Sequence, residues 1–121
     1  AISLIYSNEP FNVKGTNSIH YNGFVSKKGV DIRPTADGKN IQVTLKNKHK
    51  TSTPKDSRQV IVVKGFNSRR ALKSVKNSVK NYRPVIALAA TRRASQYLRA
   101  ARPKKTKKVA AAAAAAAPAK N

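Results

Sequence analysis

Lysine and arginine are the side chains whose number and spacing in this sequence could do chemistry, and that chemistry is the neutralisation of phosphate. The chain has 26 Lys and Arg against four Asp and Glu, a formal net charge of +22. Residues 57–121 contain seventeen of these cations and no acid, whereas residues 1–56 contain nine cations and all four acids. A surplus of this size repels itself unless a polyanion lies beside it. The composition predicts a nucleic-acid-binding protein that docks mainly through its second half.

A membrane surface is the other polyanion to consider. A basic helix that binds a membrane surface needs bulky Trp, Phe or Leu on its opposite face. The chain has no Trp, and its three Phe are scattered at positions 11, 24 and 66. No apolar run approaches the ~20 residues of a membrane span. The sequence therefore favours RNA as the ligand and predicts no membrane contact.

The sequence lacks the residues that a catalytic site or a metal site would need. There is no Cys, and the two histidines, His20 and His49, are far apart, which excludes a zinc site. The four carboxylates are scattered among turns and strand ends, where they cannot pair for acid–base catalysis, and there is no glycine-rich phosphate loop. His20 is expected at the surface or in contact with RNA. We expect no enzyme activity, no cofactor and no small-molecule substrate.

Two helices are predicted to position the cations of the second half. Helical periodicity after Phe66 predicts a helix from Ser68, its N-cap, to about Asn81. A second helix is predicted from Pro84, since proline suits a first turn, to about Ala101. Each helix segregates apolar from basic residues, as expected when its back packs on a core and its front faces an anion. The predicted core-facing residues are Ala71, Leu72, Val75, Val79 and Tyr82 in the first helix and Ile86, Ala90, Ala94, Tyr97, Leu98 and Ala101 in the second.

The predicted RNA-binding residues are the cations of the two helices and of the segment that follows them. Contacts of Lys and Arg to phosphate position a protein on a nucleic acid without reading its sequence. The residues are Arg69, Arg70, Lys73, Lys76, Lys80, Arg83, Arg92, Arg93, Arg99, Arg102, Lys104, Lys105, Lys107 and Lys108. Exposed aromatic rings can also stack on unpaired bases. Phe66 is the best candidate for stacking, because Tyr6, Tyr21, Tyr82 and Tyr97 fall on apolar faces and are expected in the core.

The first two-thirds of the chain reads as β structure. The clearest strand is Asn40–Lys46, and Asp37-Gly38 before it predicts a hairpin turn. Pro34 is expected to end the incoming strand, because it cannot donate to a ladder. The run Val60–Val63 is predicted to be a buried strand, apolar on both faces. The alternating apolar residues of the other predicted strands are Ile2, Leu4 and Tyr6, then Ile19 and Tyr21, then Val30 and Ile32, and finally Ile41, Val43 and Leu45.

The C-terminal segment has a low-complexity composition. Residues 102–108 contain five cations in seven residues, and eight alanines follow at positions 110–117. A run of like charges repels itself, and an isolated helix shorter than ~12–15 residues is marginal in water. The predicted organisation is therefore an α+β domain over residues 1–102, with a small antiparallel sheet followed by two basic amphipathic helices, and a disordered basic, alanine-rich tail over residues 103–121.

Several stretches of the chain, taken in order, resemble a known family. They are Tyr6-Ser7-Asn8-Glu9-Pro10, Asn17-Ser18-Ile19-His20-Tyr21-Asn22-Gly23, Pro34-Thr35-Ala36-Asp37-Gly38-Lys39, and the most specific one, Tyr82-Arg83-Pro84 followed by Ala89-Ala90-Thr91-Arg92-Arg93-Ala94-Ser95 and Leu98-Arg99. No single motif is diagnostic. Their order and spacing across residues 6–102 resemble the eukaryote-specific large-subunit ribosomal protein twenty-eight family.

The resemblance implies a structural, non-catalytic constituent of the large subunit of cytoplasmic ribosomes, with a nucleolar stage during assembly. The implied partners are large-subunit ribosomal RNA, on which the basic helices lie, and neighbouring large-subunit ribosomal proteins. The chain departs from the family pattern at three places. The family has a further helix and strand before the first stretch, it usually has Asp where this chain has Val85, and its tail differs after Pro103.

Two other functions agree with part of the sequence. A ribosome assembly factor is the nearer one, because a biogenesis-factor family resembles this fold pattern, although such factors usually carry added acidic or low-complexity domains. A linker-histone-like DNA architectural protein is suggested by the Lys-Lys-Thr-Lys-Lys run followed by alanines. The β-rich first half does not agree with the winged three-helix domain of that class.

Overall fold

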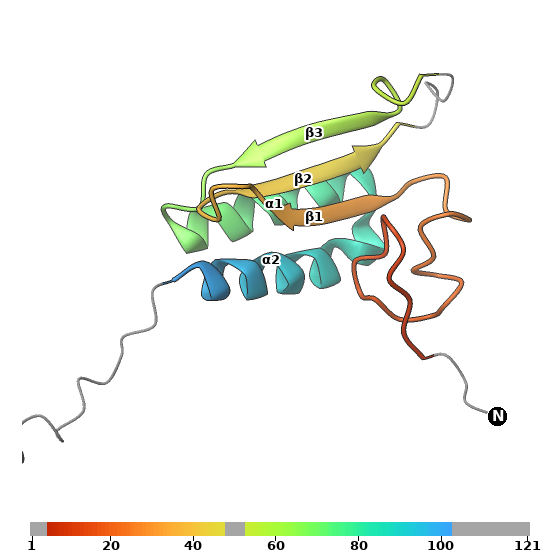
Figure 1. Ribbon diagram of the computed structural model, residues 1–121, viewed down its shortest axis with the longest axis horizontal. Coiled ribbons are helices and arrows are strands. Elements are labelled where there is room, and N and C mark those ends of the chain that lie inside the picture. The colour runs from red at the N-terminus through yellow and green to blue at the C-terminus, as the bar shows by residue number, and fades with distance from the viewer. Residues whose placement is uncertain (1–4, 48–52, 103–121) are drawn as a thin grey trace, which may run out of the picture.

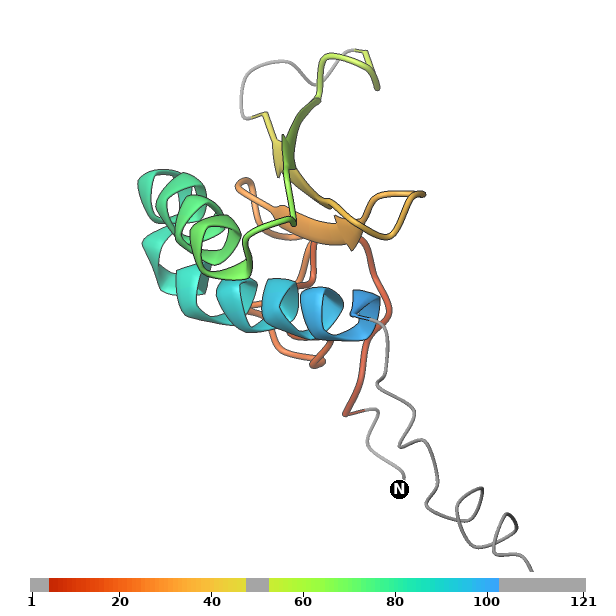
Figure 2. The ribbon, with the colours of Figure 1, turned by 90° about the vertical axis from the view of Figure 1, so that its left-hand side faces the viewer.

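The computed structural model describes residues 5–47 and 53–102, which form a three-stranded antiparallel sheet with two helices on one of its faces (Figures 1 and 2). The elements, in chain order, are β1 (Val30–Pro34), β2 (Ile41–Lys46), β3 (Arg58–Val63), α1 (Ser68–Tyr82), the short 3-10 turn η1 (Pro84–Ile86) and α2 (Ala87–Ala101). The strand order β1-β2-β3 places β2 in the centre. The predicted α+β arrangement of an antiparallel sheet followed by two basic amphipathic helices is confirmed.

The central strand β2 follows the predicted alternation. Ile41, Val43 and Leu45 are buried, because successive side chains of a strand point to opposite faces of the sheet. Val43 pairs with Ile32 of β1 and with Ile61 of β3, so the apolar residues of the three strands share one face. That face is the one on which the helices pack.

The turn between β1 and β2 has the predicted geometry. Gly38 has a φ of 68°, a left-handed conformation that glycine adopts without a steric penalty. Its N–H donates to the Thr35 carbonyl at 2.7 Å, and the Thr35 N–H donates to the Asn40 carbonyl at 3.0 Å. The prediction of a hairpin at Asp37-Gly38 is confirmed.

The apolar sides of α1 and α2 pack on the sheet and on each other. In α1, Ala71, Val75 and Val79 are buried, and Leu72 and Tyr82 are partly buried against them, as predicted. Alanine supplies much of the α2 side of this contact, and small residues allow close approach. The buried apolar residues are Phe11, Val13, Val30, Ile32, Ile41, Val43, Leu45, Ala71, Val75, Val79, Ile86, Ala87, Ala90, Ala94 and Leu98.

The helix ends differ slightly from the prediction. Asn67, not Ser68, caps α1, and its side-chain oxygen accepts from the Arg70 N–H at 3.4 Å. The residue before a proline disfavours helical backbone, and Arg83 is extended, with φ −148° and ψ 91°. Pro84 therefore begins a separate 3-10 turn, and α2 follows from Ala87. Ala101 is exposed where α2 ends, so its predicted place in the apolar face was wrong.

The strand predicted at Val60–Val63 exists, but its burial on both faces was wrong. Val60 and Val62 are 52% and 56% exposed. Because the helices cover one face of the sheet, the alternate residues Ile61 and Val63 are partly buried while Val60 and Val62 face outward. The strand also lies at the edge of the sheet, paired to β2 alone among the described strands.

The prediction of two strands before β1 is also wrong for the residues that the structure describes. Residues 5–29 form a loop, and Tyr6 makes an isolated bridge with Thr16. The Asn12 side-chain amide donates to a Glu9 carboxylate oxygen at 2.9 Å, and its oxygen accepts from the Gly15 N–H at 2.9 Å. An Asn that bonds to nearby backbone in this way competes with strand pairing. Tyr6 is 82% exposed, contrary to the prediction that it lies in the core.

Ile19 and Tyr21 mark a turn rather than a strand. The Tyr21 N–H donates to the Ser18 carbonyl at 3.0 Å, and Ile19 is exposed. Tyr21 is nevertheless partly buried against the core, as predicted. Ile2 and Leu4 lie outside the described residues.

Candidate nucleic-acid interface

The outward side of α1 carries a row of cations. Arg69, Lys73, Lys76 and Lys80 recur at spacings of three and four residues, which places them on one side of the helix. All four are exposed, as is Arg70 beside them, and α1 has no acid in its first turn. The helix therefore presents a fixed row of positive charge opposite its buried side.

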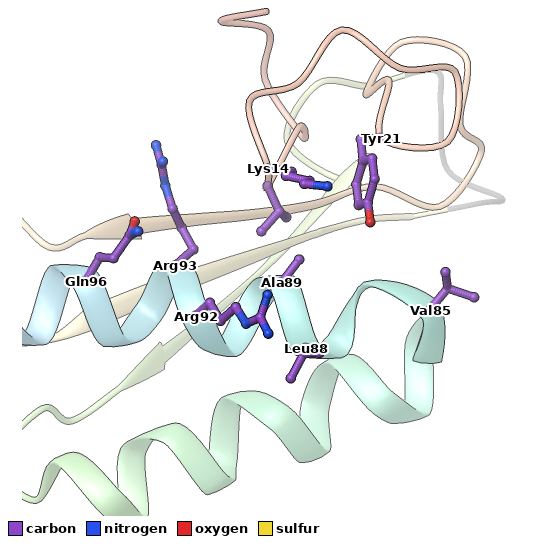
Figure 3. A pocket seen from close by; sticks show the side chains of 9 residues that line it. Lys14, Tyr21, Val85, Leu88, Ala89, Arg92, Arg93 and Gln96 are labelled. Atoms are coloured by element: carbon purple, nitrogen blue, oxygen red, sulfur yellow. The ribbon is translucent and has the colours of Figure 1, made fainter. Parts of the chain in front are cut away.

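The outward side of α2 meets the N-terminal loop in a groove of about 280 Å³ (Figure 3). Arg92 and Arg93 come from the helix, and Lys14 comes from the loop. The Lys14 ammonium lies 5.1 Å from the centre of the Tyr21 ring, within range of a cation–π contact. Leu88, which is exposed, adds apolar surface to this groove. Lys14 was not among the predicted site residues, and no local pattern marks it, because only the fold brings the loop to α2.

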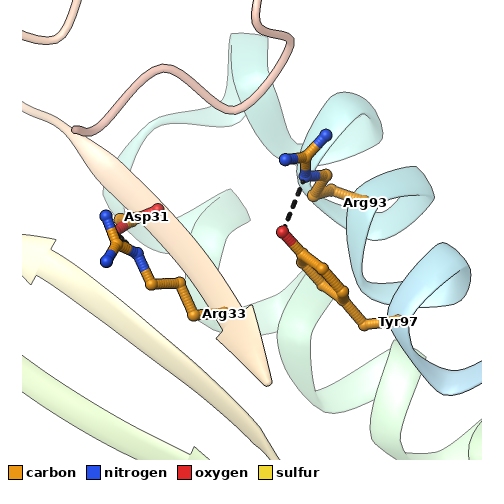
Figure 4. Close-up of polar contacts among 4 residues, drawn as sticks. All are labelled: Asp31, Arg33, Arg93 and Tyr97. Carbon is orange, nitrogen blue, oxygen red and sulfur yellow. Dashed lines mark hydrogen bonds and ion pairs between the residues drawn. The ribbon is translucent and has the colours of Figure 1, made fainter. Parts of the chain in front are cut away.

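Arg93 is oriented by a neighbour one turn along the same helix (Figure 4). Its Nε donates to the Tyr97 hydroxyl at 3.1 Å, and its guanidinium lies 5.3 Å from the centre of the Tyr97 ring. Tyr97 is itself partly buried against the core, as predicted. The ring thus holds the guanidinium while leaving Arg93 exposed.

The same view includes Asp31 and Arg33 on β1, whose side chains pair at 2.8 Å (Figure 4). This is the one ion pair found in residues 5–47 and 53–102. The cations of α1 and α2 consequently have no acidic partner in the part of the chain that the structure describes. Their charge is available to an external anion.

The C-terminal end of α2 and the N-terminal end of α1 are joined. Arg102 donates from Nη2 to the Ser68 hydroxyl at 2.7 Å. Arg69 and Arg70, which follow Ser68 in the chain, therefore lie at the same end of the molecule as Arg102. At that end Arg99 lies one turn before Arg102 and is also exposed.

Arg83 differs from the other predicted residues, because its guanidinium donates hydrogen bonds to backbone carbonyls of the N-terminal loop. Nη1 donates to the Lys28 carbonyl and Nη2 to the His20 carbonyl, each at 2.9 Å. Next to it the Tyr82 hydroxyl donates to the Lys46 carbonyl, and burial raises the pKa of Tyr82 above its ordinary value. Arg83 and Tyr82 therefore tie the N-terminal loop and the sheet to the junction of the two helices. A contact of Arg83 with RNA stays a prediction.

The other predicted RNA-binding residues that the structure describes are all exposed. They are Arg69, Arg70, Lys73, Lys76, Lys80, Arg92, Arg93, Arg99 and Arg102. Lys104, Lys105, Lys107 and Lys108 lie outside the described residues. Phe66 is fully exposed, as stacking of a base on its ring would require. His20 is exposed, as expected.

Over 5–47 and 53–102, no group of three or more His, Cys, Asp or Glu side chains is arranged to hold a metal ion. No helix in those ranges combines the length and the apolar character of a membrane span. The chemistry that this surface offers is the binding of anions by Lys and Arg.

Comparison with known proteins gives a match over nearly the whole of this structure. The model of the ribosomal L28e protein family matches residues 2–100, which include the N-terminal loop, the sheet and almost all of both helices. The chain is also similar to a protein of Schizosaccharomyces pombe named large ribosomal subunit protein eL28. The two are 27% identical over 103 residues, which cover 84% of this chain and 77% of the relative.

Proposed function

This chain belongs to the ribosomal L28e protein family, and we propose that it is a structural constituent of the large ribosomal subunit that binds and braces ribosomal RNA. The family is one of ribosomal proteins, not of enzymes, which confirms the expectation drawn from the scattered carboxylates. The proposed partners are large-subunit ribosomal RNA and neighbouring large-subunit proteins. The proposed location is the cytoplasmic ribosome, with a nucleolar stage during assembly.

The observation that carries the proposal is that the cations of both helices are exposed and have no acidic ion-pair partner in residues 5–47 and 53–102. Nine exposed Lys and Arg side chains lie on α1, on α2 and at the C-cap of α2, and no acidic residue occurs in the chain after Asp56. A cation that neutralises a phosphate releases the counterions condensed on the RNA, and this release favours binding. Binding also relieves the repulsion among the cations themselves.

The way in which the helices are anchored supports a bracing role. The buried sides of α1 and α2 fix the helix backbone that carries the cations, so less backbone freedom has to be lost on binding. Arginine adds geometry, since its planar guanidinium can hold one phosphate through two hydrogen bonds. Cations from the N-terminal loop, α1 and α2 are distant in sequence but belong to one packed unit. RNA segments held by these three elements would be fixed relative to one another.

This mode of binding favours RNA shape over RNA sequence. Phosphate contacts carry no direct sequence information, and the deep, narrow major groove of A-form RNA does not admit side chains that read bases. The protein would therefore recognise the path of the RNA backbone. In return, RNA that binds the folded chain and not the unfolded one stabilises the fold.

The salt dependence of binding tests the electrostatic part of the proposal. The full chain would be titrated with transcribed domains of large-subunit ribosomal RNA, and the dissociation constant measured at several salt concentrations. If ~6–10 phosphates are contacted, affinity should fall by ~10³–10⁵ between ~50 and ~200 mM salt. Shuffling the RNA sequence while preserving its folded shape should matter less.

A matched pair of variants shows whether the helix surface makes these contacts. Lys73→Glu, on the exposed side of α1, should weaken binding and reduce the slope of log affinity against log salt. Lys55→Glu changes the charge by the same amount at an exposed position between β2 and β3, and should leave the slope nearly unchanged. A flat salt dependence, or an equal effect of the two variants, would contradict the proposal.

Sedimentation separates the proposal from its two alternatives. A structural constituent remains with mature large subunits, an assembly factor remains with precursor particles, and a DNA architectural protein remains with chromatin. The family match favours the first outcome. Recovery of the endogenous protein mainly with precursors or with chromatin would overturn it.

A further inference from the structure

Phe66 is the most exposed large apolar side chain in residues 5–47 and 53–102, with a relative exposure of 104%. It lies in the short connection between β3 and α1. Single exposed apolar residues are common at protein surfaces, so exposure alone assigns no role. The contacts of the residues on either side of Phe66 are more informative.

Gly65 is packed closely against two other parts of the fold. A Cβ atom at this position would lie 2.0 Å from the Lys39 carbonyl oxygen and 3.1 Å from a Leu98 methyl carbon. The Gly65 N–H also donates to the Asn40 side-chain oxygen at 3.3 Å. The backbone before Phe66 is thus held against the β1–β2 turn and against α2.

The residue after Phe66 is held as well. Asn67 is the N-cap of α1, where its side-chain oxygen accepts from the Arg70 N–H and its carbonyl accepts from the Ala71 N–H at 2.9 Å. Phe66 therefore lies between two anchored residues, with its ring in solvent. A ring presented in this way is preorganised, so that little backbone freedom is lost when a ligand binds to it.

The surroundings of the ring are cationic. A groove of about 550 Å³ between β3 and α1 is lined by Phe66, Lys64 and Arg70, with Ile61 and Val63 among its apolar residues. None of the residues that line it is acidic. The Ser74 and Ser78 side chains add hydroxyl groups farther along α1. An aromatic ring next to a positively charged groove is the combination by which proteins bind single-stranded nucleic acid.

We propose that Phe66 is a stacking platform for an unpaired base of RNA, and that Lys64 and Arg70 hold the phosphates of the same nucleotide segment. This inference rests on the proposed function. It goes beyond that function because the helix cations alone do not distinguish paired from unpaired RNA, whereas a base must leave the duplex before it can stack on a side chain. Phe66 would direct the protein to a bulge, loop or junction.

A protein strand added along β3 is the other occupant to consider, since β3 pairs with β2 alone among the described strands. The charges favour RNA, because Lys64 and Arg70 stand at the groove without an acid among the residues that line it. The two occupants make different predictions for Phe66. Loss of RNA affinity on substitution of Phe66 indicates RNA, whereas poor incorporation into large subunits with unchanged RNA affinity indicates a protein neighbour.

Phe66→Trp gives a direct readout, because the chain contains no Trp and the variant would have a single indole. The probes would be an RNA hairpin with a single-stranded oligoadenosine overhang and the same hairpin with a blunt end. We expect the overhang to quench the tryptophan emission of Phe66→Trp and the blunt hairpin to quench it much less. Phe24→Trp, at an exposed phenylalanine of the N-terminal loop, is the matched control and should not be quenched by either RNA.

Phe66→Ala measures the contribution of the ring to affinity. Binding of the overhang hairpin should weaken by about 5- to 150-fold, the range expected for loss of one base–aromatic stack, with little change for the blunt hairpin. The salt slope should be unchanged, because no charge is removed. Phe66→Tyr should retain binding. The fold should be unaffected, since the ring is in solvent, and a thermal melt of Phe66→Ala checks this.

The outcomes separate this inference from the proposed function. Steep salt dependence of the unsubstituted chain, together with unchanged affinity of Phe66→Ala and no quenching of Phe66→Trp, would overturn the role of Phe66 and leave the proposed function intact. Flat salt dependence of the unsubstituted chain would overturn both. Unchanged RNA affinity with poor incorporation of Phe66→Ala into large subunits would assign the ring to a protein neighbour and also overturn the inference.

Discussion

The N-terminal loop (residues 5–29) and the helix layer (residues 68–102) use their polar side chains in opposite ways. In the loop, polar side chains bond to the local backbone: the Asn22 side-chain oxygen accepts from the Phe24 and Val25 N–H groups at 2.8 and 3.1 Å, and Asn12 closes the turn before it. In the helix layer, every cation except Arg83 is exposed. Charge is therefore available for binding mainly where the backbone does not need it.

The physical reason for this difference is the way in which each region satisfies its backbone hydrogen-bonding groups. A helix satisfies its own N–H and C=O groups, so its side chains are free for other contacts. A loop that lacks a regular ladder has to satisfy its backbone with turns, side chains or water. Arg83 lies at the boundary between the two regions, and it donates to the loop carbonyls of His20 and Lys28. A cation in a basic sequence can therefore serve the fold as well as the ligand.

The largest expected effect comes from breaking the buried side of α1. Val75 is fully buried, and Val75→Asp would place a carboxylate in the core without a partner. We expect a loss of at least about 4 kcal/mol in the free energy of unfolding, enough to unfold the domain. Circular dichroism and urea denaturation provide the measurement.

The matched control for that substitution lies on the opposite side of the same helix. Lys76→Glu should change the free energy of unfolding by less than about 0.5 kcal/mol and should weaken RNA binding. A folded Val75→Asp protein together with an unfolded Lys76→Glu protein would mean that the two sides of α1 have been assigned the wrong way round.

A smaller effect is expected at the boundary, where Arg83 and Arg92 can be compared. Arg83→Ala removes two hydrogen bonds from a charged donor to loop carbonyls, and should lower the free energy of unfolding by about 2–3 kcal/mol. Arg92→Ala removes an exposed cation of α2 and should change stability by less than about 0.5 kcal/mol while reducing RNA affinity. Denaturant titrations of both variants, with parallel RNA titrations, test the contrast. Equal stabilities of the two variants would refute a structural role for Arg83.

The smallest expected effect concerns Tyr82, which ties α1 to the sheet. Tyr82→Phe removes the hydrogen bond to the Lys46 carbonyl and should cost about 0.5–1.5 kcal/mol at neutral pH. Because burial raises the folded-state pKa of Tyr82, the stabilising contribution is fully present below the unfolded pKa of about 10 and is lost as the pH rises through the folded pKa. The stability difference between the native chain and Tyr82→Phe should therefore shrink in the interval above about pH 10. A difference that grew in this interval would contradict the assignment.

The elements that the sequence predicted well are those whose signal is local. In β2, alternation of Ile41, Val43 and Leu45 with polar residues identified both the strand and its buried face. In α1, Ala71 and Val75 recur at helical spacing, and the same spacing places the cations opposite them. Periodicity of this kind depends on the backbone geometry of one element and needs no knowledge of its neighbours.

The predictions that failed depended on neighbours. Val60 and Val62 are of a residue type that is common in buried strands. The run Val60–Val63 contains no signal that the helices cover only one face of β3. Tyr6 alternates with apolar residues as a strand residue does, yet it lies in a loop that Asn12 closes by side-chain bonds. The apolar character of a side chain shows that its burial would be favourable. Whether it is buried depends on which other elements pack against it.

By itself the sequence determined the asymmetry of charge, the absence of zinc and catalytic constellations, and the buried side of each helix. Each of these follows from which residues are present and from the spacing within one element. The tertiary structure alone decided that Lys14 joins the α2 arginines, that Arg83 serves the loop, and that Gly65 holds Phe66 in solvent beside a cationic groove. These are contacts between segments distant in the chain, and their geometry exists only after the sheet and the helices have packed.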